Sequence, residues 1–144
     1  MSATPRQPQN AEPLALEYEG VAASLWQARS DITDWLRDRG CDDDSVERAV
    51  LIASELATNA IQAAPGAPFT VLLESVSPHH VELTIANPNA DTSIPPGRPW
   101  TTSQVLAPQG RGLGIVDALS DDVAARIENG SVVVTARIRT TSLH

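Results

Sequence analysis

Residues 44–64 constrain the fold of this chain more than any other segment, because their apolar residues follow a helical period. The stripe steps by three or four positions and is built mostly from alanine: Val46, Val50, Ala53, Ala57, Ala60 and Ala64. Asp44 followed by Glu47 resembles a capping box, with aspartate in the capping position, and places the helix start near residue 44. The "PGAP" at residues 65–68 ends the helix. A helix with one apolar stripe has to bury it against another layer, so the flanking segments decide the architecture.

Strand patterns lie on both sides of this helix. The turn around Pro78 joins two of the strands, and His79 and His80 are expected to be exposed there. Asn129-Gly130 is a strong signal for a two-residue hairpin between two others. The predicted strands cover residues 14–20, 69–77, 79–87, 124–130 and 131–138.

Two further helices complete the prediction. Residues 21–40 carry apolar residues at helical spacing and stop at Gly40, and a third helix follows the glycine cluster in "GRGLGIVDALSDDV", residues 110–123. The order is strand, helix, helix, strand, strand, long loop, helix, strand, strand. Because strands and helices do not alternate, we predict an α+β fold: a two-layer sandwich with a mixed, mostly antiparallel sheet and helices on one face.

The chain of 144 residues fits a single domain. Residues 1–13 are polar, carry three prolines and are expected to be a disordered tail, which leaves residues 14–144 as the domain. Residues 88–109 form a 22-residue stretch with five prolines and no periodicity. Loops of this length inside a compact domain are usually functional or disordered.

Charge and cysteine content exclude several classes of protein. The formal net charge is -8, and all ten basic residues are arginine, so a sequence-independent grip on nucleic acid is not expected. The single cysteine, Cys41, cannot form an internal disulfide and is read as a packing or surface residue, and no Cys/His spacing reads as a zinc site. The sequence shows no signal peptide and no apolar run that could span a bilayer, so we expect a cytoplasmic protein with no membrane partner.

Glu55 and Asn59 are the first candidate site residues. With Gln62 they sit at i, i+4 and i+7, so they line one face of the predicted helix. One reading is an ordinary solvated polar face. The other is a pocket wall, because small apolar residues crowd the same turns. In a pocket, the carboxylate could accept a proton and the amide oxygen could bind Mg²⁺, an arrangement suited to phosphoryl transfer.

The cluster "GRGLG" at residues 110–114 is the second candidate site. Gly110, Gly112 and Gly114 let a ligand approach the backbone, and the start of the following helix favours an anion. Arg111 adds a full positive charge. The P-loop pattern is absent, and the cluster does not follow a convincing strand as a dinucleotide fingerprint would. The alternatives are a phosphate site and a merely flexible loop.

Three motifs together resemble the histidine kinase-like ATPase domains, and within them the bacterial anti-sigma-factor serine kinases. "SELATNAIQAA" is similar to the first box of the family, "LTIANPN" ends a strand where the second box begins, and "GRGLGIVDALSDD" is similar to the third box. The resemblance covers residues 14–139. It implies a Bergerat-type ATP site between the sheet and the helices, closed by a lid formed by residues 88–109.

The resemblance also implies roles for individual residues. Glu55 would be the general base and Asn59 the Mg²⁺ ligand. Ser131 lies near a position that helps to seat adenine. The phosphates would be cradled by Gly110, Arg111, Gly112, Leu113 and Gly114.

The chain departs from the family pattern around the second box. Asn87 stands where the family has an aspartate that accepts a hydrogen bond from the adenine amino group. An amide oxygen can accept that bond, but more weakly than a carboxylate. Asn89 and Asp91 replace two glycines, and Asp91 could make the adenine contact if the register shifts. Ala63 stands where many relatives carry a histidine.

The implied function is an ATP-dependent anti-sigma factor that phosphorylates a serine of an anti-anti-sigma antagonist protein and binds a sigma factor. Relatives often form homodimers through the first strand and helix. The alternative is a binding module of the same fold with weak or no catalysis. A detached two-component kinase domain is disfavoured, because no phosphoacceptor helix precedes the domain, and the charge of -8 opposes a nucleic-acid-binding domain.

Overall fold

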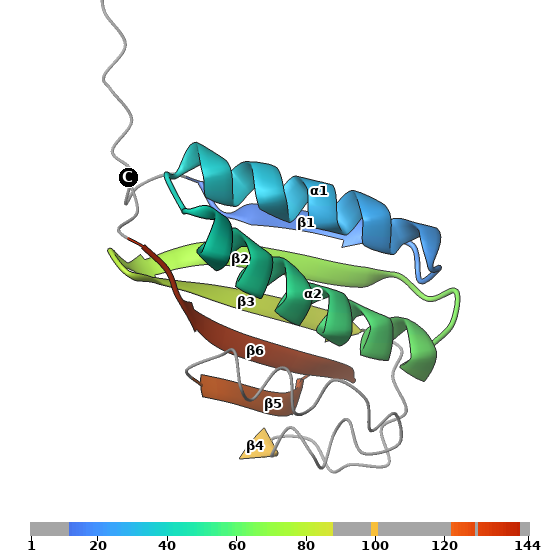
Figure 1. Cartoon of the computed structure of the whole chain (residues 1–144). Helices are drawn as coiled ribbons and strands as arrows, with labels where there is room; N and C mark the ends of the chain where they lie inside the picture. The colour runs from blue at the N-terminus through green and yellow to red at the C-terminus, as the bar shows by residue number, and fades with distance from the viewer. Residues whose placement is uncertain (1–11, 88–98, 101–121, 129, 142–144) are drawn as a thin grey trace, which may run out of the picture.

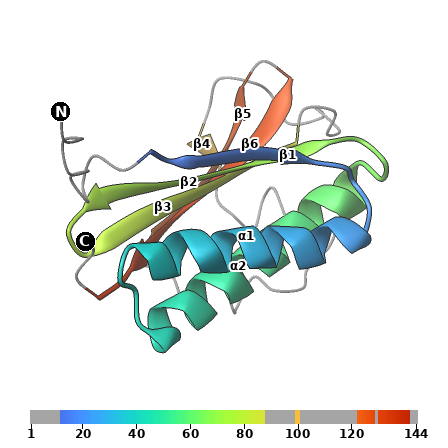
Figure 2. The same ribbon diagram turned by 90° about the horizontal axis from the view of Figure 1, so that it is seen from above.

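Two helices lie side by side across one face of an antiparallel sheet, which gives two layers (Figures 1 and 2). The computed structural model describes residues 12–87, 99–100, 122–128 and 130–141. The helices are α1 (Ala23–Asp38) and α2 (Asp43–Ala63). The strands are β1 (Leu14–Tyr18), β2 (Phe69–Ser77), β3 (His80–Asn87), β4 (Pro99–Trp100), β5 (Asp122–Glu128) and β6 (Ser131–Arg139).

The six strands follow the order β1-β2-β3-β6-β5-β4. Two hairpins, β2–β3 and β5–β6, meet where β3 pairs with β6, with Leu83 opposite Ala136. Every strand pair in the described residues is antiparallel. The predicted α+β architecture with helices on one face is therefore confirmed, as are both hairpins. Gly130, in the predicted two-residue turn, has the positive φ of 79° that such turns require.

The core lies between the helices and the near face of the sheet. Strand residues alternate between buried and partly exposed, as expected for a sheet covered on one side only. Each large aliphatic side chain buried there contributes roughly 1.5–3 kcal/mol relative to exposure. The most fully buried large apolar side chains are Ile32, Leu36, Ile52, Phe69, Val71, Leu73, Val81, Leu83 and Ile138. Three of the six predicted stripe residues of α2 are buried within the helix, so the predicted face is the one that packs on the sheet.

The start of α2 differs from the prediction. The capping residue is Asp42, whose Oδ1 accepts a 2.9 Å hydrogen bond from the backbone N–H of Ser45, and not Asp44. Asp44 lies within the first turn and is exposed. Three consecutive aspartates offered three possible starts, and the helix uses the first, because the Asp42 carbonyl already accepts from Val46.

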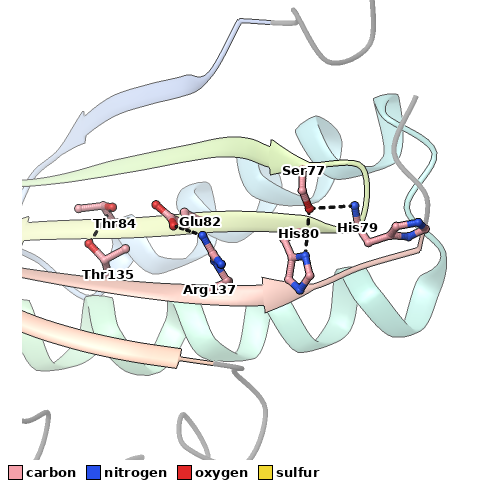
Figure 3. Close-up of polar contacts among 7 residues, drawn as sticks. All are labelled: Ser77, His79, His80, Glu82, Thr84, Thr135 and Arg137. Carbon is pink, nitrogen blue, oxygen red and sulfur yellow. Dashed lines mark hydrogen bonds and ion pairs between the residues drawn. The ribbon is translucent and has the colours of Figure 1, made fainter.

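The far face of the sheet carries paired polar side chains (Figure 3). Across β3 and β6, Thr84 and Thr135 are hydrogen-bonded at 3.1 Å, and Arg137 donates to Glu82 at 3.2 Å. At the hairpin end, His79 is exposed as predicted. His80 is not: it lies in β3, is half-buried, and its Nδ1 is 2.9 Å from the hydroxyl of Ser77.

Two further predictions need correction. Residues 99 and 100, inside the predicted loop, form the short strand β4 opposite Arg126 and Ala125. The predicted third helix cannot extend to residue 123, because β5 begins at Asp122. The rest of that predicted helix lies outside the described residues. Neither of the two helices in the described part of the chain has the length and apolar character needed to cross a bilayer.

Candidate functional site

Helix α2 carries both predicted residues of the first box. Glu55 is half-buried, and one turn later Asn59 is buried, with only 3% of its surface exposed. Gln62, further along the same line, is exposed. A neighbouring side of the helix faces α1, where Arg29 donates a 2.9 Å hydrogen bond to the hydroxyl of Ser54. The polar line is therefore not a fully solvated face, because its central residue is enclosed.

The side-chain amide nitrogen of Asn59 is buried, and its bonding within the described residues is incomplete. Its Nδ2 makes no hydrogen bond within the part of the chain that the structure describes. Buried polar groups are nearly always bonded, and leaving one unbonded costs about 1–3 kcal/mol. Since a half-turn of the amide exchanges its nitrogen and oxygen ends, the same group can present either a donor or an acceptor. An unsatisfied group of this kind is a candidate contact for a polar ligand.

Asn87, at the end of β3, lies close to the same part of α2. It is 3% exposed, and its Nδ2 donates a 2.7 Å hydrogen bond to the backbone carbonyl oxygen of Ala60. Ala60 follows Asn59 directly, so this bond attaches the end of β3 to the turn of α2 that carries Asn59.

Ser131 starts β6 at the same end of the sheet. Its neighbour Val132 pairs with Asn87 in the β3–β6 register, and Ser131 itself is half-buried opposite Glu128. The structure therefore brings Asn59 and Asn87 together at one end of the two layers, with Glu55 one turn away along α2. Ser131 lies at the same end of the sheet, but it alternates with Val132, so its side chain belongs to the far face that carries Thr135 and Arg137.

The glycine cluster lies outside the described residues. Gly110, Arg111, Gly112, Leu113 and Gly114 are all in this group. The same holds for Asn89 and Asp91 and for most of the predicted lid, residues 88–109. Their assignment to the phosphates and the lid stays a prediction.

The residues near Asn59 fit a hydrated Mg²⁺ better than a metal held by protein ligands alone. Among the described residues, no group of three or more His, Cys, Asp or Glu side chains could hold a metal ion. Mg²⁺ commonly uses one or two protein oxygens together with water and substrate phosphates. The buried amide of Asn59 has an Nδ2 that is unpaired in the described residues, and a half-turn of the amide puts its oxygen in that place. It can therefore supply one such oxygen, so the donor set is compatible with Mg²⁺ bound together with a nucleotide.

A separate hollow of about 390 Å³ lies on the far face of the sheet, away from the helices. None of the predicted site residues lines it. Its walls come from four strands and are mostly polar: Leu72, Glu74, Glu82, Thr84, Asp122, Ala124, Arg126, Thr135 and Arg137. A polar, open sheet face is usual in an antiparallel sheet that is covered on one side, and it carries no site residue here.

The sequence profile of the histidine kinase-like ATPase domain matches residues 20–138, which is most of the chain. The chain belongs to the histidine kinase-like ATPase domain family. Membership of a family of ATPase domains implies nucleotide binding. The resemblance places the nucleotide at the end of the two layers where Asn59 and Asn87 lie. A search of curated protein sequences found no match.

A solved structure with the same fold contains the RsbU and RsbW domains of Rv1364c from Mycobacterium tuberculosis. The two share 16% sequence identity with a TM-score of 0.68, over 90% of this chain and 33% of that one. This chain therefore spans about a third of the length of its structural neighbour, and identity this low demonstrates a shared fold only.

One contributor to the site was not predicted. The backbone carbonyl of Ala60 binds Asn87, and a backbone group carries no residue-type signal in a sequence. The available signal was the position of Asn87 itself, an amide at the end of a buried strand, which requires a bonding partner.

Proposed function

We propose that this chain binds ATP with Mg²⁺ at the Glu55/Asn59 face of α2 and transfers the γ-phosphoryl group to a serine of an anti-anti-sigma antagonist protein. The observation that carries the proposal is the buried amide of Asn59, whose Nδ2 is unpaired in the described part of the chain, one turn after the half-buried carboxylate of Glu55. Family membership supports the nucleotide, and the motif resemblance to anti-sigma-factor serine kinases supports the protein substrate.

Each residue has a distinct task in this proposal. Glu55 accepts the proton of the attacking serine hydroxyl while the serine oxygen bonds to the γ-phosphorus, and ADP leaves. Asn59 offers its amide oxygen to Mg²⁺, which when bound offsets the negative charge of the phosphates. Asn87 and Ser131 lie at the proposed adenine end. The phosphate contacts are assigned to Gly110, Arg111, Gly112, Leu113 and Gly114.

The proposed partners follow from the same resemblance. The chain would hold a sigma factor until the antagonist displaces it, and phosphorylation would release the antagonist. A homodimer through β1 and α1 and a cytoplasmic location belong to the same proposal. Similarity of fold to a protein that contains an RsbW domain is consistent with it.

A phosphotransfer assay with ATP and a cognate antagonist tests the catalytic part. Glu55→Gln should lose transfer but keep ATP binding, because the amide cannot take the proton. Glu47→Gln is the matched control, since Glu47 is an exposed glutamate of the same helix. Full transfer by Glu55→Gln would show that the base has been assigned wrongly.

A second candidate function is favoured by Asn87. An amide in place of the adenine-reading aspartate suits a binding module with weak or no catalysis, which regulates a sigma factor or another partner by docking alone. Calorimetric titration with ATP, together with the phosphotransfer assay, distinguishes the kinase from the docking module. Micromolar binding together with transfer above background would exclude the docking-only function.

A further inference from the structure

Asn87 makes a contact that an aspartate could not make. Its partner, the backbone carbonyl oxygen of Ala60, can only accept a hydrogen bond. The amide nitrogen of Asn87 must therefore be the end that faces it, and the direction of the 2.7 Å bond is fixed by chemistry. An ionised carboxylate in the same place would bring an acceptor against an acceptor.

The carbonyl of Ala60 also closes α2. It accepts the backbone N–H of Ala64, the residue that caps the helix, at 3.2 Å. A carbonyl oxygen has two lone pairs and can accept two hydrogen bonds. Asn87 supplies the second from β3, across the interface between the two layers, so it adds a bond at the last turn of α2 in which no basic residue stands.

Asn59 lies one residue before Ala60. Its Nδ2 is buried with no hydrogen-bond partner in the described part of the chain, so no bond from this nitrogen holds the amide. The position of the side chain then depends on the backbone of its turn. The bond from Asn87 holds that turn against the sheet.

We propose that Asn87 is a positioning residue: through the carbonyl of Ala60 it fixes the turn of α2 that presents Asn59 to the Mg²⁺–nucleotide. The inference rests on the proposed function of Asn59. It adds that the amide of Asn87 acts through its N–H donor. The resemblance instead implies that the side-chain oxygen at this position accepts a hydrogen bond from the adenine amino group.

The two roles predict opposite effects of Asn87→Asp. If residue 87 serves only as an acceptor for adenine, a carboxylate is the stronger acceptor and ATP binding tightens. If it positions Asn59, the variant loses a donor and sets a negative charge against the carbonyl of Ala60. Mg²⁺–ATP binding then weakens by about tenfold, the cost of one buried hydrogen bond.

Calorimetric titrations with ATP, in Mg²⁺ and in EDTA, test this with the variants Asn87→Asp, Asn59→Ala and their combination. We expect Asn87→Asp to weaken binding in Mg²⁺ and to have little further effect once Asn59 is alanine, because both changes act on one interaction. Arg37→Gln is the control for charge, since it makes the net charge more negative by one at an exposed position of α1 outside the candidate site. Tighter binding by Asn87→Asp, or fully additive losses, would overturn the proposal.

The 6-amino group of the base gives an independent readout. The triphosphate of purine riboside lacks this group but is otherwise identical to ATP. For a positioning residue, Asn87→Ala and Asn87→Asp weaken both nucleotides equally. A loss confined to ATP would mean that Asn87 reads the base and does not act through Asn59.

Thermal unfolding without nucleotide separates this inference from the proposed function. The order of Tm should be wild type, then Asn87→Ala, then Asn87→Asp, because alanine only removes the donor whereas aspartate also adds repulsion at Ala60. If the wild type binds no ATP, the proposed function fails, and this order still decides whether Asn87 holds the end of α2. A Tm for Asn87→Asp equal to that of the wild type would refute the bond as a structural constraint.

Discussion

The phenol of Tyr18 donates a 2.7 Å hydrogen bond to Oδ2 of Asp31, and this contact joins the edge strand β1 to helix α1. Gln27 donates to the other carboxylate oxygen of Asp31 at 2.9 Å. The Tyr18 ring stacks on Phe69 with the ring centroids 5.6 Å apart. The edge strand is thus held by polar and apolar contacts of one side chain, in addition to its pairing with β2.

The single tyrosine of the chain should titrate well above its ordinary pKa. Burial, then the hydrogen bond with Asp31 and the charge of that carboxylate, raise the pKa of Tyr18 above the usual value of 10.0. Because the folded protein holds this proton more tightly than the unfolded chain, stability should fall as the pH rises above that usual value. Ultraviolet absorbance of the phenolate follows Tyr18 alone. Asp31→Asn should lower the pKa, and titration of the wild type at the usual value would contradict the contact.

Replacing Asp42, the residue that caps α2, should destabilise the protein, whereas replacing the nearby Asp44 should not. Asp42→Ala leaves the backbone N–H of Ser45 without its acceptor and should lower Tm by about 4 °C. Asp44→Ala, in the exposed first turn, is the control and should change Tm much less. Circular dichroism melts of the two variants provide the measurement. Equal decreases in Tm for the two variants would favour the capping box at Asp44 that the sequence predicts.

The same cap predicts a dependence on acid. The hydrogen bond from the Ser45 backbone holds the pKa of Asp42 below its usual value of 3.8. A depressed pKa stabilises the fold at pH values above the usual pKa, and this contribution is lost as the pH falls through the folded-state value. Asp42→Asn keeps an acceptor that does not titrate. The wild type should therefore lose stability relative to Asp42→Asn on acidification, and parallel acid-unfolding curves would be evidence against the bond.

Cys41 should resist alkylation in the folded protein. Burial, with a smaller effect from the charge of Asp42, raises the pKa of its thiol to about 11, and only 8% of the residue is exposed. The thiolate is the reactive form, so both effects slow the reaction. Iodoacetamide near neutral pH should label the unfolded chain in urea much faster than the native protein. Equal rates would mean that the turn between the helices opens freely.

The sequence predicted those parts of the fold that have short-range signals. The alanine stripe, the strand alternation and Asn129-Gly130 each act within a few residues, and each gave an element that the structure contains. The spacing of Glu55 and Asn59 likewise placed two side chains on one helix face. The remaining features depend on contacts across the chain. Choosing Asp42 over its neighbours, forming β4 and binding Asn87 to a backbone carbonyl all require knowledge of which segments meet.

Two buried asparagines provide the sharpest comparison between stability and function. Asn59 and Asn87 are each 3% exposed, but the Nδ2 of Asn87 is bonded to Ala60, whereas that of Asn59 has no partner within the described residues. Leucine has the same branched side-chain shape, with two methyl groups in place of the polar atoms. Asn59→Leu should therefore raise the free energy of unfolding by about 1 kcal/mol, and Asn87→Leu should lower it by a similar amount.

The stabilised variant should lose its ligand. Asn59→Leu removes the proposed Mg²⁺ ligand, so it should unfold at a higher temperature and yet show no effect of Mg²⁺ on ATP binding. Chemical denaturation gives the first quantity and calorimetry the second. If Asn59→Leu is more stable and Mg²⁺ still affects ATP binding, Asn59 is not the Mg²⁺ ligand. If the variant is less stable, Asn59 has a bonding partner within the protein, and its buried amide no longer argues for a ligand.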